Sequence, residues 1–464
     1  MSNNKLQHKI PTIVEATKGL AFGQLEALVM KEVKLPLAKQ THEVCWEPHT
    51  KSLWVTQMSN STLVRLTVDE KGILNDQQDS WTVGPTDGGL HNASISFAHP
   101  GHLWLSLQYL NTLILIDVRP GDSFLEVKEI YQVPTCIKVD GEEKHVGGPH
   151  VVRECPLTGC IWAGLKAALD VDSPCAKISQ CCDPVLMKEA MLEHSNNSDH
   201  DVEIPNSFAV WHLDRDKYDP NSKCGAKGGT IFPCDPSPPM MAIDDSGVAW
   251  VAQDAHHQVF VCNPHNGESF KKDVPWPLTA TSEQKHTGPG IASDPAGNIW
   301  MTQLETMASM VRFDKDTKEA VLYECKPPAW AKAIRMIHMS FCKASVPEHH
   351  NRIYAIASTL LQDDSTDALV IINMDDDWKV IKGVRIVPLP SQRSACHRIT
   401  YCDIDDGDNE CDDGSVFITE LSKSKLLQVK MNNDVVMTPL EEIITTDSAG
   451  FEHRSYTLPD GFEH

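Results

Sequence analysis

Histidines stand at the starts of several short apolar segments, and polar residues stand at the ends of the segments that follow. The histidines are His42, His91, His150, His338 and His397. The polar residues are Gln57, Gln108, Lys166, Gln253, Gln303 and Glu420, with Glu305 close by. Imidazole carries protons near neutral pH, and a neighbouring carboxylate raises its basicity. If the segments meet at one place, these residues predict a site for acid–base chemistry on a bound ligand.

His397 and Glu420 bracket one hairpin and are the predicted acid–base pair, with His338 and His150 as the next catalytic candidates. A lone histidine at a strand start is more often a capped or solvated residue, so the prediction depends on convergence. The remaining residues are predicted to hold the ligand: His42, Gln57, His91, Gln108, Lys166, Gln253, Gln303 and Glu305.

An aromatic residue that returns seven times marks the elements that must position these side chains. Its copies are Trp54, Trp104, Trp162, Trp250, Trp300, Tyr354 and Phe417. A short apolar run and a turn precede most copies, and another run rich in β-branched residues follows. Such runs with polar turns between them predict strands. A repeat of roughly fifty residues predicts an all-β, seven-bladed β-propeller with four-stranded blades.

In such a ring, the starts of the first strands and the ends of the second strands point to one central mouth. The repeated aromatics are predicted to pack between blades rather than to react. Residues 32–37 are expected to supply the fourth strand of the last blade and so close the ring. We expect 32–445 to form a single propeller, with 1–31 and 446–464 peripheral.

The third repeat carries an insertion at about 166–239, which includes a segment of helical periodicity at 184–194. The insertion is expected to cover the mouth as a lid or to extend into solvent. It holds a cysteine cluster, for which structural thiols, a local disulfide and a zinc site are the alternatives, in that order. The cluster comprises Cys175, Cys181, Cys182, Cys224 and Cys234.

The composition limits the partners. The 464 residues carry a formal charge of −23, which argues against nucleic acid and anionic membranes, because both attract Lys and Arg. No apolar run approaches a membrane span, and Met1–Lys9 leads into no apolar segment of signal-peptide type. A cytoplasmic protein that acts on a small molecule is therefore expected.

One repeat also supports a family resemblance. Gly288–Gln303 reads Gly-Pro-Gly-Ile-Ala-Ser-Asp-Pro-Ala-Gly-Asn-Ile-Trp-Met-Thr-Gln, and Val311-Arg-Phe-Asp314 follows; Pro149–Val152 and Ile418–Glu420 carry parts of the pattern. Over about 32–445, without the insertion, the chain resembles the virginiamycin B lyase (streptogramin lyase) family of seven-bladed propellers. The resemblance implies elimination that opens a cyclic depsipeptide, with a histidine base and Mg²⁺ held partly by glutamates. His397 and Glu420 are similar to that His/Glu pair.

These observations predict a natural-product lyase or dehydratase that works in the propeller mouth, with a reaction that either stands alone or is coupled to cyclisation. Relaxed relatives also resemble fungal tailoring enzymes, so a pericyclase of the hetero-Diels–Alderase type is one alternative. Such an enzyme needs hydrogen-bond donors and a shaped apolar mouth but no metal. A non-catalytic propeller that binds a protein partner is the other alternative. A lactonase-like metal hydrolase would need more carboxylates at the mouth than the sequence offers.

Overall fold

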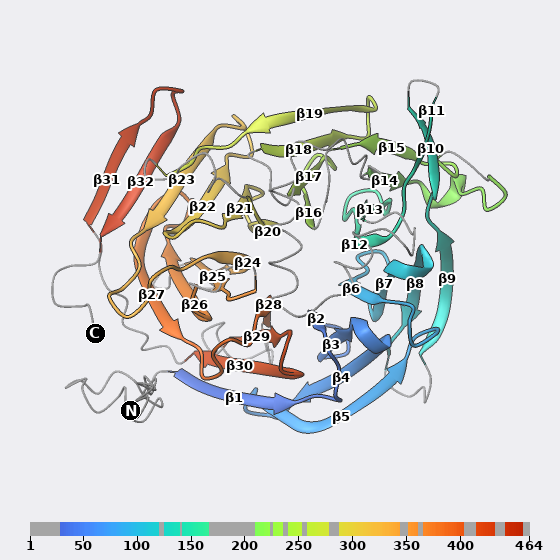
Figure 1. Ribbon diagram of the computed structural model, residues 1–464, viewed down its shortest axis with the longest axis horizontal. Helices are drawn as coiled ribbons and strands as arrows, with labels where there is room; N and C mark the ends of the chain where they lie inside the picture. The colour runs from blue at the N-terminus through green and yellow to red at the C-terminus, as the bar shows by residue number, and fades with distance from the viewer. Residues whose placement is uncertain are drawn as a thin grey trace, which may run out of the picture.

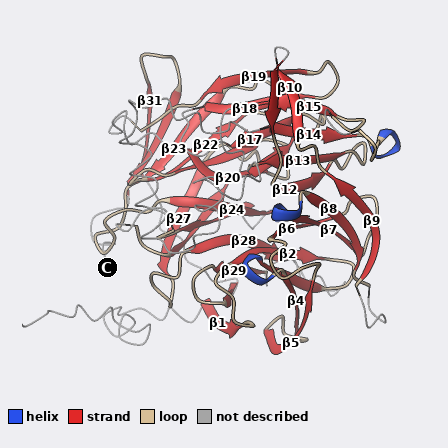
Figure 2. Ribbon diagram, turned by 45° about the vertical axis from the view of Figure 1, so that its right-hand side comes forward, coloured by secondary structure: helices blue, strands red, loops and turns tan. Residues whose placement is uncertain are grey.

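The computed structural model describes residues 28–119, 125–139, 142–166, 209–222, 226–234, 240–252, 258–277, 287–343, 351–360, 365–402, 414–431 and 441–457. Strands make up nearly all of the regular structure in these ranges, with only short 3-10 turns between them (Figure 2). None of the helices there is long and apolar enough to cross a membrane. The predicted residues Gln253, Cys175, Cys181, Cys182 and Cys224, and the segment 184–194, lie outside the described ranges.

Seven antiparallel sheets stand around a common axis and form a seven-bladed propeller, as predicted (Figure 1). The innermost strands of blades 1 to 7 are β2 (Thr41–Glu47), β6 (Leu90–Ile95), β12 (Pro149–Glu154), β16 (Met240–Ile243), β20 (Thr287–Ser293), β24 (Met336–Cys342) and β28 (Cys396–Cys402). The second strands are β3 (Ser52–Gln57), β7 (His102–Leu107), β13 (Ile161–Leu165), β17 (Ala249–Ala252), β21 (Ile299–Gln303), β25 (Asn351–Ala357) and β29 (Ser415–Glu420).

The outer strands complete each blade in sequence order. The third strands are β4 (Thr62–Val68), β8 (Thr112–Asp117), β14 (Ala209–Leu213), β18 (Gln258–Asn263), β22 (Ala308–Phe313), β26 (Ala368–Met374) and β30 (Lys425–Met431). The fourth strands of blades 1 to 6 are β5 (Leu74–Thr82), β9 (Glu126–Gln132), β15 (Thr230–Pro233), β19 (Glu268–Asp273), β23 (Ala320–Cys325) and β27 (Ile381–Pro388).

The first described strand closes the ring. Strand β1 (Leu28–Lys34) pairs antiparallel with β30 and becomes the fourth strand of blade 7. This pairing joins the N-terminal strand to the last blade and covers the edge of β30 that would otherwise be exposed. The closing strand thus begins at Leu28, somewhat before the predicted 32–37, and it extends into the segment 1–31 that was expected to be peripheral.

Two segments differ from the expected layout. Residues 230–233, which the sequence placed in the insertion, form β15 and complete blade 3. The chain after the seventh blade forms β31 (Glu441–Thr446) and β32 (Glu452–Thr457), and β32 pairs parallel with β23, so blade 5 has six strands (Figure 1).

A hairpin of β10 (Cys136–Val139) and β11 (Glu142–His145) leads into blade 3. Cys136 is disulfide-bonded.

The repeated aromatics pack between blades, as expected. Each is at most 2% exposed, and the Trp54 ring joins a core with Leu90 and Ala93 of the next blade. In blade 5 the Trp300 indole donates to Asp294 Oδ2 over 2.8 Å. Asp294 also accepts from the backbone N–H groups of its own turn, which Gly297 completes at φ +90°. The Asp-x-x-Gly turn and the aromatic therefore form one structural unit.

Candidate functional site

The inner strands share an irregularity at the end of the ring where they begin. In blades 1, 2, 3, 5, 6 and 7, the pairing of the first and second strands skips a step there. Opposite Thr56, for example, blade 1 places both His42 and Glu43. A β-bulge breaks the regular alternation of side chains and redirects the bulged residues. All five predicted histidines lie at or beside these bulges.

Hydroxyl groups two residues after the repeated aromatic stabilise four of the bulges. Each accepts a hydrogen bond from the backbone N–H of the second bulge residue, and two of them also donate to the neighbouring blade. The N–H bonds are Glu43 to Thr56 (3.0 Å), Asn92 to Ser106 (3.1 Å), Gly290 to Thr302 (3.2 Å) and Arg398 to Thr419 (3.0 Å). Thr56 Oγ1 donates to the His91 carbonyl and Thr419 Oγ1 to the His42 carbonyl, both over 2.9 Å.

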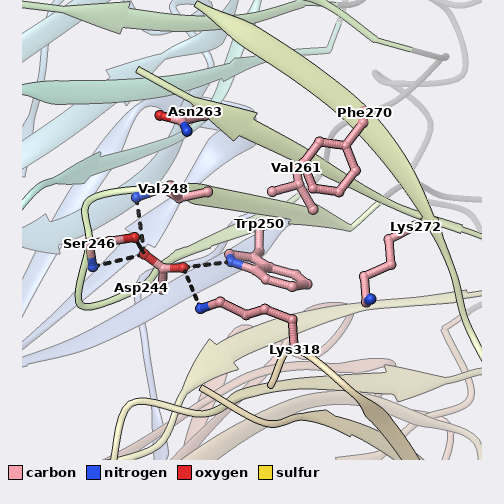
Figure 3. Close-up of a pocket in the computed structure, with 9 residues that line it drawn as sticks. All are labelled: Asp244, Ser246, Val248, Trp250, Val261, Asn263, Phe270, Lys272 and Lys318. Atoms are coloured by element: carbon pink, nitrogen blue, oxygen red, sulfur yellow. Dashed lines mark hydrogen bonds and ion pairs between the residues drawn. The ribbon is translucent and has the colours of Figure 1, made fainter. Parts of the chain in front are cut away.

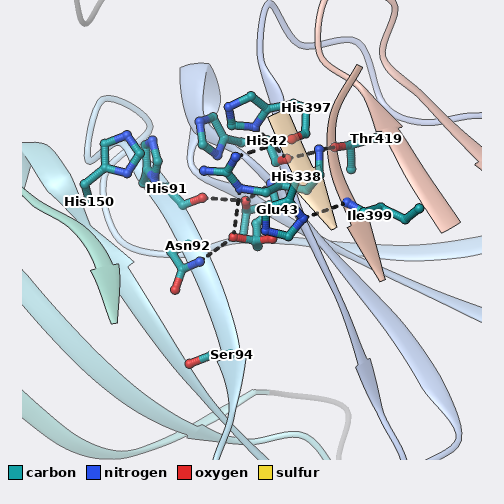
Figure 4. Close-up of polar contacts among 12 residues, drawn as sticks. His42, Glu43, His91, Asn92, Ser94, His150, His338, His397, Ile399 and Thr419 are labelled. Atoms are coloured by element: carbon teal, nitrogen blue, oxygen red, sulfur yellow. Dashed lines mark hydrogen bonds and ion pairs between the residues drawn. The ribbon is translucent and has the colours of Figure 1, made fainter. Parts of the chain in front are cut away.

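Four imidazole rings from blades 7, 1, 2 and 3 meet at this end of the axis (Figure 4). Ring centroids are 3.9 Å apart for His397 and His42, 3.6 Å for His42 and His91, and 3.6 Å for His91 and His150. The four side chains are only 3% to 7% exposed. The Nζ atom of Lys166 lies 3.5 Å from His150 Nε2. The convergence that the sequence predicted for these five residues is therefore present in the structure.

Burial holds the pKa of each of these imidazoles well below the usual value, and neighbouring groups lower it further. For His397 the main neighbour is Arg398, and for His150 it is His91, followed by Lys166. A charged imidazole loses its hydration when buried and is repelled by nearby cations. The rings are therefore neutral at pH 7, and each can accept a proton or a metal ion through one nitrogen.

His338 lies one level below this group. In the register of its blade it corresponds to Glu43 and Asn92, not to His42 and His91. Its Nδ1 accepts from the Ile399 N–H over 3.4 Å (Figure 4), and burial lowers its pKa well below the usual value. His338 therefore lies outside the group of four rings.

A buried polar layer lies directly under the four rings. Glu43 Oε2 accepts from Asn92 Nδ2 over 2.5 Å and lies 3.4 Å from Arg398 Nε. Asn92 Oδ1 in turn accepts from Arg153 over 3.0 Å. The sequence analysis did not predict this layer. The sequence feature that marks the layer is a polar residue directly after each histidine at 42, 91 and 397. The bulge turns these polar residues toward the same region as the histidines.

The predicted glutamines point elsewhere. Gln57 and Gln303 are fully buried, and their amides donate to the carbonyls of Pro36 (2.6 Å) and Pro275 (2.7 Å) in the links between blades. Gln108 begins the 3-10 turn η3 (Gln108–Leu110) and is 1% exposed, and Glu305 is 3% exposed. Successive strand residues face opposite sides. The hydroxyls thus face the next blade, and the glutamines face the previous one.

The same alternation separates Glu420 from His397. Thr419 and His397 both contact His42 of blade 1, through hydrogen bonds and ring packing. Glu420 faces the other way, where burial and the Glu32 charge raise its pKa to about 8. The predicted pairing of His397 with Glu420 as acid and base is therefore corrected. Both residues are buried at one end of blade 7, but they project from its opposite faces.

Three of the imidazoles are close enough to share a metal ion. One nitrogen from each of His42, His91 and His150 lies within 4.8 Å of the others. Mg²⁺, which the sequence resemblance implied, requires oxygen ligands and near-ideal octahedral geometry. The donors here are imidazole nitrogens, and Glu43 is already engaged by Asn92 and Arg398. The residues of the mouth do not fit Mg²⁺.

A surface hollow of about 210 Å³ lies away from the axis, beside the first hairpin of blade 4 (Figure 3). Asp244 is its central acid, and its carboxylate accepts from Trp250 Nε1 (3.0 Å) and Lys318 Nζ (3.2 Å) and from the Ser246 and Val248 N–H groups. Because these contacts already stabilise the turn and the blade interface, the hollow is a structural feature and not the candidate site.

Comparisons with known proteins identify the fold. No protein-family model matches the chain. No curated protein matches its sequence. The structure of virginiamycin B lyase from Staphylococcus aureus is similar, with a TM-score of 0.53 and 11% identity over 87% of this chain and 99% of the lyase. A streptogramin B lyase structure gives 0.52 and 15% over 89% and 100%. The WD40 repeats of RRP9 give 0.50 and 6% over 88% and 98%. The seven-bladed fold is therefore common to lyases and to WD40 repeats.

Proposed function

We propose that the protein is a small-molecule lyase that removes a proton from its substrate in the mouth of the propeller and expels a leaving group, as water or as a ring-opening alkoxide. The observation that carries the proposal is the meeting of four neutral imidazoles with Lys166 at one end of the axis. Propellers of known lyases share the fold, which is consistent with the proposal.

His397 is the proposed general base. Its Nδ1 lies 3.3 Å from the His42 carbonyl, so a ring that donates there leaves Nε2 as the proton acceptor. A positioned base typically contributes on the order of 10²–10⁴-fold to the rate. Lys166 is the proposed partner of the negative charge that develops as the proton leaves. Glu420 has no part in this proposal, because it faces away from the rings.

The test compares metabolites that the wild type and His397→Ala consume from one extract of natural products, followed by mass spectrometry. Lyase chemistry predicts products that are isomers of their substrates or lack one water, and His397→Ala should form them at least about 100-fold more slowly. His265→Ala, on the exposed rim of blade 4, is the matched control and should keep full turnover. Products that gain water would indicate a hydrolase, and an unchanged rate for His397→Ala would exclude the assigned base.

A further inference from the structure

The imidazoles of His42, His91 and His150 each have a buried ring nitrogen that a bound ligand could pair with. Their Nδ1 atoms are buried and have no hydrogen-bond partner among the described residues. Buried polar atoms are nearly always paired, because an unpaired one loses its hydration without compensation. Three such atoms on touching rings, each side chain more than nine-tenths buried, mark a candidate binding site for a ligand.

We propose that His42, His91 and His150 form a three-histidine site for a divalent transition metal ion of the Zn²⁺ class. One nitrogen of each ring lies within 4.8 Å of the other two. Tetrahedral Zn²⁺ with bonds of about 2.0–2.1 Å sets its nitrogen ligands roughly 3.4 Å apart, so the rings need to close by roughly an ångström. Neutral imidazole suits Zn²⁺, Cu²⁺ and Fe²⁺ and not Mg²⁺.

The backbone already places the three ligands at neighbouring bulges, and side-chain hydroxyls hold the main chains of two of them. His91 and His150 are the extra residues of their bulges, and His42 shares the step opposite Thr56 with Glu43. The Thr56 hydroxyl bonds the His91 carbonyl, and the Thr419 hydroxyl bonds the His42 carbonyl. Ligands held in this way, as His42 and His91 are, lose little freedom when an ion binds. Three protein ligands leave a fourth position open, as in catalytic zinc sites.

The charges around the triad predict what occupies that position. Lys166 lies beside His150, and Arg398 and Arg153 lie near the rings, while Glu43 is the acid beneath them. These side-chain cations repel a metal ion bound to the triad, and the repulsion is weaker if the metal ion also binds an anion. The fourth ligand is therefore an anion, either hydroxide or an anionic group of the small molecule.

The metal site does not depend on the proposed lyase activity, and its test uses no substrate. The full-length protein is stripped with a chelator and titrated with Co²⁺, a spectroscopic substitute for Zn²⁺, and Zn²⁺ is then added in competition. The proposal predicts one Co²⁺ per chain with visible absorption typical of four-coordinate nitrogen and oxygen ligation. Zn²⁺ should displace it. His91→Asn should weaken binding at least about 100-fold, since even outer-shell changes cost 10–100-fold.

His338→Asn is the matched control, because it removes a buried mouth histidine outside the triad, and it should leave Co²⁺ affinity unchanged. If circular dichroism shows that His91→Asn is unfolded, His150→Asn takes its place. Equal Co²⁺ affinity in the wild type and the triad variants would overturn the proposal. So would the absence of visible absorption, or a strong near-ultraviolet thiolate band in its place, which would locate the ion on cysteines. A negative result here leaves the His397 test of the lyase untouched.

Discussion

Replacing Glu420 with glutamine should stabilise the protein, and the gain should grow with pH. Glu420 is fully buried beside Glu32, and its pKa is raised to about 8 by burial and by the Glu32 charge. The pKa of Glu32 is lowered, despite burial, by hydrogen bonds from Lys425 (2.5 Å) and Ser391 (2.6 Å). Near neutral pH, therefore, Glu32 is ionised while Glu420 keeps its proton.

The direction of the pH effect follows from proton binding. Between the ordinary carboxyl pKa of 4.5 and the native value of about 8, the folded protein holds a proton on Glu420 that the unfolded chain has lost. Stability therefore falls as pH rises through this window. A difference of one between the folded and unfolded pKa corresponds to about 1.4 kcal/mol. The loss of folding stability caused by Glu420 therefore reaches roughly 4 kcal/mol at pH 8, before allowance for coupling to Glu32. Glutamine mimics the protonated acid and escapes the penalty.

The assay is denaturant unfolding of the wild type and Glu420→Gln at several pH values from 4.5 to 8. The quantity of interest is the difference between the two proteins, because the buried histidines, whose pKa values are lowered from 6.5, make both proteins less stable as pH falls below that value. Gln57→Glu is the matched reverse change, since Gln57 stands at the same position in blade 1 and donates to the Pro36 carbonyl. It should destabilise increasingly as pH rises. A difference between wild type and Glu420→Gln that does not change with pH would refute the reasoning.

Two further substitutions test how the blades pack. Measured by calorimetry, Trp300→Ala should lower the free energy of unfolding by about 3–5 kcal/mol, because the ring is fully buried. The control Trp330→Ala, at a 40% exposed site, should change it by less than about 1 kcal/mol. Similar losses in the two variants would contradict the role of Trp300 in the core between blades. Gly290→Ala should cost about 1–3 kcal/mol in the same assay, because its new methyl would meet the Ile337 carbonyl of the next blade at 2.7 Å; an unchanged stability would show that the two blades are not in close contact there.

The blade count and the meeting of four histidines could be predicted from the sequence, for related reasons. The buried aromatics recur once per blade because each interface needs a large side chain, so Trp54 and Trp300 mark the ring even without other similarity. Antiparallel blades around an axis all begin their inner strands at one end. A residue type repeated at those starts, as at His42 and His91, must therefore gather there.

The partners of the histidines could not be predicted in the same way. Residues at the ends of second strands lie near the mouth, but alternation along the strand decides which of two successive side chains faces it. Gln57, Gln303 and Glu420 consequently face the links between blades, and the hydroxyls just before them take the inner role. The polar layer of Glu43 and Arg398 stayed hidden for the same reason, since regular alternation would turn them away from the histidines.

The bulges also explain why the mouth is one-sided and where it can adjust. The positions that hold His42, His91 and His397 correspond to Pro289 in blade 5 and Ile337 in blade 6, so among the described residues the meeting imidazoles come from consecutive blades. Hydroxyls fix the bulges of blades 1, 2 and 7, but Gly164 stands at that position in blade 3, opposite Val151. The bulge that carries His150 therefore lacks this hydrogen bond. Of the three proposed metal ligands, His150 has the least constrained main chain, so most of the closing movement toward an ion should fall on it.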